Sequence, residues 1–262
     1  MNRATRDDGL EGKVAIISGG ASGIGRASAV AFARAGTHSI VGHFPGDLHD
    51  PNEVVTEVEH AGARCEVVDV DVRDADQVQV FAQAALDRLG RLDVCVAGAG
   101  ILRRAALTDL SDHAWDDMLQ VDLTGVMRVM RSAAAVMPGP GAMVAISSIA
   151  GGVYGWEEHA HYAAAKSGVL GLCRSLAVEL APRGIRVNTV IPGLIRTPQS
   201  LDAVNSLGAQ GLQEAGAIIP LGRVGTDDEA ARVIRFLASQ DAAYVTGQQF
   251  VVDGGLTIRW PS

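Results

Sequence analysis

The sequence predicts an α/β fold, a doubly wound sheet of seven mostly parallel strands with helices on both faces. Three observations predict it. Short apolar runs alternate with longer amphipathic segments along all 262 residues, as in chains built from parallel strands and crossover helices. No repeat, linker or low-complexity block interrupts this alternation. A glycine-rich turn directly follows the first apolar run, which is where nucleotide-binding sheets carry one.

Each element is expected from a local signal. Strands are short apolar runs, and they lie at residues 14–18, 38–43, 64–72, 92–98, 141–148, 185–191 and 247–255. Helices carry apolar residues three or four positions apart, and they lie at residues 24–36, 51–62, 74–90, 111–136, 159–180 and 227–239. The helix ends carry the usual signals, with Asp74 as an N-cap, Pro51 in a first turn, and Gly36 and Gly62 as stops.

The remaining segments lack these patterns. Residues 192–225 are predicted to be one irregular stretch, and it contains a substrate loop at about residues 193–220. The polar start of the chain predicts a mobile tail over residues 1–11. Because the composition is uniform, we expect residues 12–262 to form one dinucleotide-binding domain rather than two domains.

The composition disfavours several classes of function. The formal net charge is -8 and no basic run occurs, which argues against binding to nucleic acid or to an anionic membrane. The start lacks the apolar core of a secretory signal, and no apolar run approaches the ~18 residues of a membrane span. Cys65, Cys95 and Cys173 lack the close spacing of a metal site. We therefore expect a soluble cytoplasmic protein with a small-molecule substrate and no metal.

The first glycine-rich turn, SGGASGIG, is a candidate phosphate-binding site. Gly19, Gly23 and Gly25 lie between the first strand and the first helix with the spacing GxxxGxG. Glycines there permit a tight turn and allow a phosphate to approach the backbone at the helix N-terminus. An ordinary turn between a strand and a helix can also be rich in glycine, so the motif needs support from the rest of the chain.

A candidate proton-transfer pair lies in the segment HYAAAK. Tyr162 and Lys166 are four residues apart, so they share one helix face. A lysine ammonium ~4 Å away is worth ~4 kcal/mol at an effective dielectric constant of ~20, which could lower the tyrosine pKa by up to ~3 units, to near 7. Ser148 ends the preceding strand, at the sheet edge where ligands bind. The alternatives are a chance pair in an alanine-rich helix and a serine that only caps a turn.

Two histidines precede the pair. His159 and His161 in EEHAH look like possible metal ligands, but residues two apart do not face each other on a helix. No second cluster supports a metal site, so we interpret this segment as a polar loop rim. His161, beside Tyr162, could still contact substrate.

Several motifs in order carry a family resemblance. They are SGGASGIG, DV at residues 71–72, LDVCVAGAGI, SSIAG, YAAAK, RVNTVIPGLIRT and VDGG, and together they span about residues 11–256. With these motifs the chain resembles the short-chain dehydrogenase/reductase family, in the single-domain branch that includes 3-oxoacyl-(acyl-carrier-protein) reductases. The resemblance implies a Rossmann-type fold, an NAD or NADP cofactor, interconversion of a secondary alcohol and a ketone, and a homo-oligomer, often a tetramer.

The resemblance also implies roles for single residues. Ser148 would hold the substrate oxygen, Tyr162 would act as acid/base, and Lys166 would bind ribose hydroxyls and lower the tyrosine pKa. Asp122 stands where the family usually has a catalytic Asn, and its backbone carbonyl could serve the same water relay. The implied cofactor contacts are Gly19, Ser22, Gly23, Ile24, Gly25, His43, Asp71, Val72, Ala97, Gly98, Ala99, Tyr162, Lys166, Pro192, Gly193, Ile195 and Thr197.

Two departures from the family pattern have expected consequences. The carboxylate of Asp122 could change the pH dependence of catalysis. Residues 97–100 read Ala-Gly-Ala-Gly, where the family usually has Asn-Asn-Ala-Gly. We expect the side-chain hydrogen bonds that brace the sheet there to be lost, although the turn itself stays possible.

The end of the second strand predicts a preference between cofactors. His43 lies where NAD enzymes of the family tend to carry Asp, and Phe44 lies where an arginine would favour NADP. Ser22 holds a place where NADP enzymes often have a basic residue, while Asp47 and Asp50 add negative charge. A 2′-phosphate would meet one partly protonated histidine among carboxylates, so we expect NAD to be preferred over NADP.

We therefore expect an NAD(P)-dependent oxidoreductase, and two alternatives stay open. One is a 3-oxoacyl-(acyl-carrier-protein) reductase, and the other is a non-catalytic nucleotide-sensing protein on the same fold. A carrier protein is strongly acidic, and MPGPGAM before the serine strand has no Lys or Arg, so despite Arg183 we expect weak docking. Substrate contacts are expected at about residues 101–107, 153–161 and 194–219, whose residue types fit small or medium apolar ketones.

Overall fold

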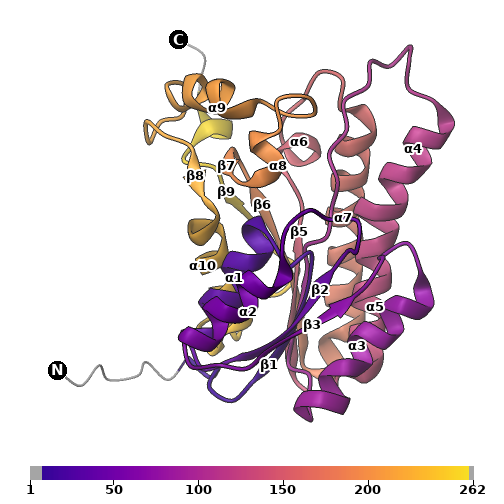
Figure 1. Ribbon diagram of the computed structural model, residues 1–262, viewed down its shortest axis with the longest axis vertical. Helices are drawn as coiled ribbons and strands as arrows, with labels where there is room; N and C mark the ends of the chain where they lie inside the picture. The colour runs from indigo at the N-terminus through magenta and orange to yellow at the C-terminus, as the bar shows by residue number, and fades with distance from the viewer. Residues whose placement is uncertain (1–7, 260–262) are drawn as a thin grey trace.

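A seven-stranded sheet runs through the middle of the protein in the computed structural model, which describes residues 8–259 (Figure 1). The strands are β1 (Val14–Ser18), β2 (His38–His43), β3 (Cys65–Asp69), β4 (Val94–Ala97), β5 (Gly141–Ile146), β6 (Ile185–Pro192) and β9 (Gln249–Val252). Every neighbouring pair is parallel, and the order is β3-β2-β1-β4-β5-β6-β9. The predicted fold class is confirmed.

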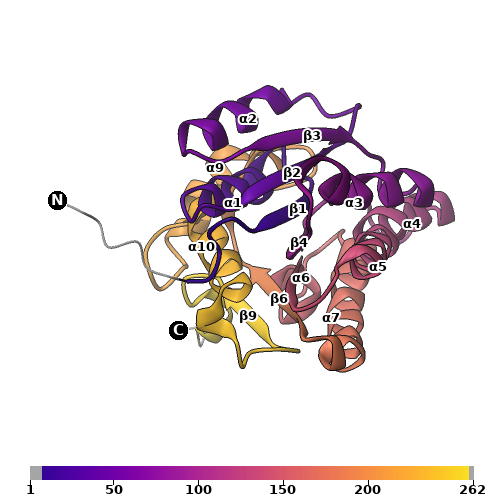
Figure 2. The same cartoon turned by 90° about the horizontal axis from the view of Figure 1, so that it is seen from below.

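Helices cover both faces of this sheet, as Figures 1 and 2 show. One face carries α1 (Gly23–Ala33), α2 (Pro51–His60) and α10 (Asp227–Ala238). The other carries α3 (Ala75–Leu89), α5 (Val126–Val136) and α7 (Ala160–Leu180), with α4 (Asp112–Leu119) on the same side. Asp74 caps α3 as predicted, because its carboxylate accepts hydrogen bonds from the N–H groups of Asp76 and Gln77.

The sheet separates two hydrophobic cores. Successive side chains of a strand point to opposite faces. Val14 and Ile16 therefore pack in the core shared with α3, α5 and α7, whereas Ala15 and Ile17 pack in the core shared with α1, α2 and α10. Every residue of β1 is buried, which is why the strands read as continuous apolar runs. The strand order reverses between β1 and β4, and ligands bind beyond the strand ends at such a point.

The prediction of one continuous α-helix over residues 111–136 is wrong. It consists of α4, a π-helical turn named η1 (Gln120–Gly125), and α5. The chain stays helical through this π-helical turn, so the spacing of apolar residues in the sequence does not predict it. Asp122 lies in this turn, and π-helical turns occur frequently at functional sites.

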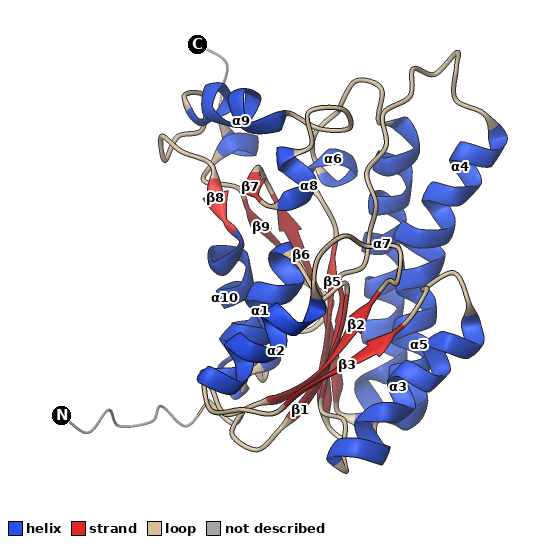
Figure 3. Ribbon diagram, in the orientation of Figure 1, coloured by secondary structure: helices blue, strands red, loops and turns tan. Residues whose placement is uncertain are grey.

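Residues 192–225 are also more regular than predicted. They hold the helices α8 (Pro198–Leu201) and α9 (Gly208–Gly216) and a small parallel sheet of β7 (Ile195–Arg196) and β8 (Gly225–Thr226). Figure 3 shows these elements above the upper ends of β6 and β9. They were missed because each is too short to show a period. The other short elements are α6 (Ile149–Gly152) and the 3-10 turns η2 (Ala181–Arg183), η3 (Gln240–Ala242) and η4 (Leu256–Ile258).

The chain is packed from the first residue described. The predicted tail covers residues 1–11, of which 1–7 lie outside the described residues. Leu10 is buried in the core beside α1 and α10, and the Asp8 carboxylate lies 3.7 Å from the guanidinium of Arg235 on α10. The packed chain therefore begins earlier than the sequence predicted. None of the helices within residues 8–259 is long and apolar enough to cross a membrane.

Candidate active site

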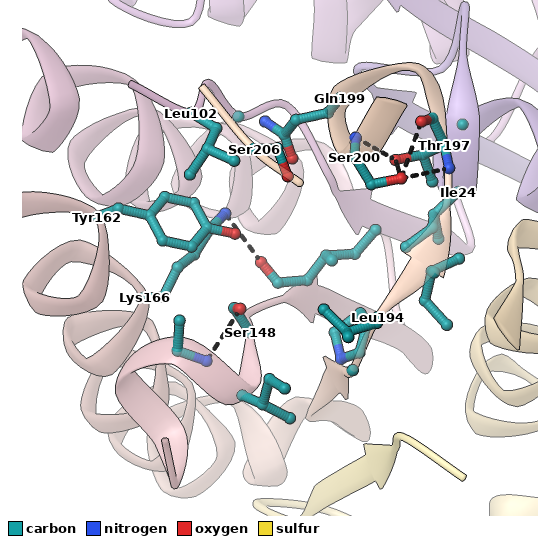
Figure 4. A pocket seen from close by; sticks show the side chains of 18 of the residues that line it. Ile24, Leu102, Ser148, Tyr162, Lys166, Leu194, Thr197, Gln199, Ser200 and Ser206 are labelled. Carbon is teal, nitrogen blue, oxygen red and sulfur yellow. Dashed lines mark hydrogen bonds between the residues drawn. The ribbon is translucent and has the colours of Figure 1, made fainter. Parts of the chain in front are cut away.

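A cleft of about 420 Å³ lies at the carboxyl ends of the strands. Most of the predicted site residues line it, namely Gly19, Ser22, Gly23, Ile24, Gly25, Gly98, Asp122, Ser148, Tyr162, Lys166, Pro192, Gly193, Ile195 and Thr197. The predicted residues that do not line it are His43, Asp71, Val72, Ala97 and Ala99. Figure 4 shows Tyr162 and Lys166 entering the cleft together from one helix, with Ser148 across from them.

The glycine-rich turn between β1 and α1 forms one wall of the cleft. Gly19 has a left-handed backbone with φ of 67°, and a Cβ at Gly25 would collide with the Gly19 carbonyl oxygen. Ser22 precedes α1 without a side-chain capping hydrogen bond, and no acidic residue lies in the first turn of the helix. Uncapped amide groups at a helix N-terminus attract anions. The turn therefore fits the phosphates of a dinucleotide.

The turn after β4 is braced from the neighbouring strand. The Ser18 hydroxyl accepts hydrogen bonds from the N–H groups of Gly98 at 3.1 Å and Ala99 at 3.3 Å. The side-chain bracing that we expected to be lost at residues 97–100 is thus supplied in part by Ser18. A Cβ at Gly19 would lie 2.8 Å from the Ala99 Cα, so the two turns pack backbone against backbone.

The three predicted catalytic side chains meet in the cleft. Tyr162 and Lys166 lie in the first turns of α7 and are 7% and 5% exposed. The Lys166 ammonium is 5.6 Å from the centroid of the Tyr162 ring and donates a hydrogen bond to the Ile146 carbonyl at 3.3 Å. Ser148 precedes α6, where its hydroxyl accepts a hydrogen bond from the N–H of Ala150 at 3.1 Å.

Asp122 makes a buried ion pair that sequence reasoning missed. Its side chain is fully buried, Oδ1 accepts a hydrogen bond from the N–H of Ile101 at 2.8 Å, and Oδ2 lies 3.0 Å from Lys166 Nζ. The predicted role of Asp122 used only its backbone carbonyl. A Cβ at Gly100 would lie 3.0 Å from Oδ2 and 3.2 Å from Nζ, so a glycine there leaves room for the ion pair.

The pKa of Tyr162 is raised, not lowered as the sequence predicted. Burial is the main cause, and the Asp122 carboxylate acts in the same direction, while the Lys166 ammonium and a hydrogen bond with Ser148 oppose it. The prediction counted the lysine but neither burial nor Asp122. Burial alone would lower the pKa of Lys166, but Asp122 and Tyr162 outweigh it and leave this pKa raised. Burial also raises the pKa of Asp122 against the effect of Lys166.

The end of β2 lies beside the cleft rather than in its wall. His43 is buried, and its Nδ1 lies 2.9 Å from the Oδ1 of Asp69 at the end of β3. Its Nε2 is buried and has no hydrogen-bond partner within residues 8–259. The predicted cofactor contact at His43 would therefore be made by a ring that already pairs with a carboxylate.

Arg73 is a charged neighbour of this region that sequence reasoning missed. Its guanidinium lies 5.8 Å from the centroid of the Phe44 ring. It also pairs with Asp71 at 2.8 Å and with Asp117 at 2.9 Å. The side-chain hydrogen bond from Arg73 is the main reason that the pKa of Asp71 is lowered. The position of Arg73 directly after the DV motif was the signal that could have found it.

Beyond Ser148, Tyr162, Lys166 and Asp122 the cleft wall is mostly apolar. The apolar lining residues include Leu102, Ile149, Ala150, Tyr154, Trp156, Leu194, Leu207, Ala215, Ile218 and Leu256. Most of them fall in the predicted substrate segments, but Ile149, Ala150 and Leu256 were missed. The first two directly follow Ser148, so their place beside the catalytic serine could have been inferred. Figure 4 shows Leu102 and Leu194 on two sides of the cleft.

The histidines before Tyr162 are buried, and the predicted polar rim is wrong. His161 is fully buried, and neither of its ring nitrogens has a hydrogen-bond partner in the described part of the chain. Burial lowers the pKa of His161, and the charge of His159 lowers it further, so His161 is a neutral core residue that does not line the cleft. His159 is buried as well. Residues 8–259 contain no cluster of three or more potential metal ligands.

Comparison with known proteins relates the whole chain to one group of enzymes. A model of the family described as "Enoyl-(Acyl carrier protein) reductase" matches residues 19–257. The 3-oxoacyl-[acyl-carrier-protein] reductase FabG of Thermotoga maritima is 40% identical over 251 residues, which cover 95% of this chain and 99% of that protein. The cis-4-hydroxycyclohexanecarboxylate dehydrogenase of Sinomonas cyclohexanicum is 40% identical over 248 residues, which cover 94% of this chain and 96% of that protein.

Solved structures show the same relationship. Levodione reductase superposes with a TM-score of 0.89 at 31% identity, over 95% of this chain and 99% of that one. A short-chain type dehydrogenase/reductase from Mycobacterium marinum superposes with a TM-score of 0.88 at 32% identity. The superposition covers 95% of this chain and 97% of that one. The similarity therefore extends over nearly all of the sheet and its helices.

Proposed function

Because this chain belongs to the short-chain dehydrogenase/reductase family, we propose that its cleft interconverts a secondary alcohol and a ketone with Tyr162 as acid/base. The family acts on alcohol and carbonyl groups with NAD(P). The observation that carries the proposal is the meeting of Ser148, Tyr162 and Lys166 in one cleft that the uncapped start of α1 also lines.

The cleft offers matching places for the cofactor. The glycine-rich turn, with Gly19, Ser22 and Gly23, would hold the phosphates, because the first amide groups of α1 are uncapped there. Lys166 would donate to ribose hydroxyls. Thr197, which caps α8 through Ser200, would lie against the carboxamide of the nicotinamide.

The side chains of the protein would orient the substrate and transfer the proton. When bound, the nicotinamide ring supplies or accepts the hydride. Ser148 donates a hydrogen bond to the substrate oxygen, and in the reducing direction the Tyr162 hydroxyl donates its proton to the developing alkoxide. The raised pKa of Tyr162 favours the protonated form that this step needs. The Lys166 ammonium stabilises the phenolate that remains, and Asp122 holds the ammonium in place.

We propose an apolar ketone of small or medium size as the substrate. Apart from Lys166, Asp122 and Asp47, the residues that line the cleft are uncharged. Lys166 is already paired with Asp122, so an anionic substrate would find no free cation among the described lining residues. One relative is named for a hydroxycyclohexanecarboxylate. Its ring, without the carboxylate, fits this apolar wall, so uncharged cyclic ketones are the first compounds to test.

A panel of ketones and alcohols tests this function. Purified protein would be assayed for nicotinamide absorbance changes with NAD and NADP in both directions. We expect turnover of several cyclic ketones, and a kcat that is roughly 10²- to 10⁴-fold lower in a Tyr162→Phe variant. Cofactor binding without turnover of any compound would instead favour the nucleotide-sensing alternative.

A carrier-linked 3-oxoacyl reductase is the second candidate, favoured by the similarity to FabG of Thermotoga maritima. Docking of an acidic carrier would need free basic side chains. Arg183, near the segment MPGPGAM, donates hydrogen bonds to the carbonyls of Ala134 and Met137, both at 2.8 Å, so it is already engaged. We expect slow reduction of a carrier-bound 3-oxoacyl chain. Efficient reduction that is lost at high salt would overturn this ranking.

We further propose that NAD is preferred. The basic side chains nearest the end of β2 already contact carboxylates, since Arg73 pairs with Asp71 and Asp117, and His43 contacts Asp69. A 2′-phosphate would have to displace one of these carboxylates. A homotetramer and a cytoplasmic location are proposed from the family resemblance, and light scattering after size exclusion tests the first.

A further inference from the structure

The buried ring of His159 joins the catalytic helix to the segment that covers the cleft. Nδ1 lies 2.7 Å from the carbonyl oxygen of Glu157, and Nε2 lies 3.0 Å from the carbonyl oxygen of Asn205. His159 directly precedes α7, which carries Tyr162. Asn205 precedes Ser206 and Leu207, which line the cleft. One side chain therefore links two parts of the site that are distant in sequence.

Both hydrogen-bond partners of the ring are acceptors. A carbonyl oxygen cannot donate, so each ring nitrogen must carry a hydrogen to make its bond. A neutral imidazole carries a hydrogen on only one nitrogen, whereas the imidazolium carries one on both. The observed contacts at Glu157 and Asn205 are therefore both satisfied only when His159 is charged.

An aromatic contact supports the charged form. The His159 ring stacks on Trp156 with a centroid distance of 3.9 Å and an interplanar angle of 15°. A cation over the face of a tryptophan is stabilised by the ring quadrupole. Trp156 also lines the cleft, and its ring lies edge-on to the Tyr162 ring with a centroid distance of 6.5 Å. The ring of Trp156 therefore contacts both His159 and Tyr162.

The other charged groups around the ring have partners of their own. Glu158 pairs with Arg104, and Asp202 accepts hydrogen bonds from the N–H of Val204 and the side chain of Asn205, both at 2.8 Å. On α7 the nearest titratable neighbour is His161, whose pKa is lowered. Glu157 is an exposed residue that contributes its backbone carbonyl. None of these side chains forms a hydrogen bond with a ring nitrogen of His159 within residues 8–259, so the two backbone carbonyls are the partners that decide which nitrogens must carry a hydrogen.

We propose that His159 is a positioning residue, whose imidazolium latches residues 202–207 to the start of α7 and so closes the cleft on the substrate. This inference rests on the proposed function for its effect on turnover, but the latch itself does not. When the ring loses a proton, one of its two nitrogens faces a carbonyl oxygen with a lone pair, and that hydrogen bond is lost. Residues 202–207 are then held less firmly to the residue that precedes α7.

The latch predicts an effect on substrate binding more than on chemistry. Within residues 8–259, no hydrogen bond joins the His159 ring to Ser148, Tyr162 or Lys166. We expect the KM for the ketone to rise roughly 3- to 10-fold when the His159 ring loses a proton at higher pH, because the loss of one net hydrogen bond has about this effect. We expect kcat to change less over the same range.

The first test is the pH profile of the His159→Gln variant. A glutamine amide donates hydrogen bonds but does not titrate in this range, so the variant should lose the step in KM and keep a high KM throughout. The matched control is His113→Gln, which removes an exposed histidine from α4 and should keep the wild-type step. A step in KM that persists in His159→Gln would overturn the proposal.

The second test needs no turnover. Hydrogen exchange of residues 202–207 would be measured in the wild type across pH and corrected for the intrinsic rate. We expect protection that falls as the pH rises, with no matching change in α3. Protection that does not depend on pH would reject the latch even if His159→Gln fails to fold. Normal latch behaviour in a protein without any turnover would reject only the proposed function.

Discussion

The Asp122 carboxylate and the Lys166 ammonium form an ion pair of 3.0 Å, in which the two side chains are 0% and 6% exposed. The pair connects the π-helical turn η1 to α7. Lys166 is thereby held from two sides, because it also donates a hydrogen bond to the carbonyl of Ile146. The charge that acts on Tyr162 is therefore set by a residue on another helix as well as by its own lysine.

Asp122→Asn should shift the pH dependence of alcohol oxidation to lower pH. The Asp122 carboxylate raises the pKa of Tyr162, and its removal lets that pKa fall. Oxidation needs the phenolate as base, so its rate increases as pH rises through the pKa of Tyr162. The ascending limb of kcat against pH should therefore move to the acid side. Asp116→Asn, at an exposed position of α4, is the control, and an unmoved limb in Asp122→Asn would contradict the assignment.

Tyr162→Phe should leave cofactor binding nearly unchanged and lower kcat by roughly 10²- to 10⁴-fold, the usual contribution of a general acid or base. The ring stays in place, so its packing against Trp156 is kept. Cofactor affinity from fluorescence titration and kcat from steady-state rates separate the two effects. Tyr244→Phe, which changes a fully exposed tyrosine, should behave like the wild type. Near-normal turnover of Tyr162→Phe would remove this residue from the mechanism.

Gly100→Ala should impair catalysis although Gly100 is not a catalytic residue. The new Cβ would lie 3.0 Å from Asp122 Oδ2 and 3.2 Å from Lys166 Nζ, so the ion pair has to move. Small displacements of catalytic groups cost roughly 10- to 100-fold in rate, and we expect a loss of kcat on that scale. Gly171→Ala on α7 is the control, because a Cβ there meets nothing within 4 Å. Equal activity of both variants would show that the ion pair tolerates displacement.

NAD should be used with a higher kcat/KM than NADP at both pH 6 and pH 8. The carboxylates of Asp69, Asp71 and Asp117 surround the cations near β2 and repel a 2′-phosphate. His43→Gln keeps all three carboxylates, so it should keep the preference for NAD. A preference for NADP at pH 8 would contradict the charge argument.

The sequence by itself predicted the layered fold and the meeting of Ser148, Tyr162 and Lys166 at one sheet edge. Alternation of apolar runs and amphipathic segments is a local property, since each strand or helix shows its buried face within a few residues. The glycine-rich turn and Ser148 each come directly after a strand, and Tyr162 and Lys166 follow in the next helix. Because a parallel sheet brings the carboxyl ends of its strands to one edge, these residues were expected to lie close together. These residues line the cleft as predicted.

Tertiary structure alone decided the contacts that tune the site. The ion pair of Asp122 with Lys166, the place of Arg73 over Phe44, and the bond of His159 to Asn205 each join segments that are far apart in sequence. No local period encodes such contacts, because they depend on which helix packs beside which strand end. Burial reversed the predicted direction of the Tyr162 pKa for the same reason. The loss of solvent around a side chain is a property of the packed protein and not of its neighbours in sequence.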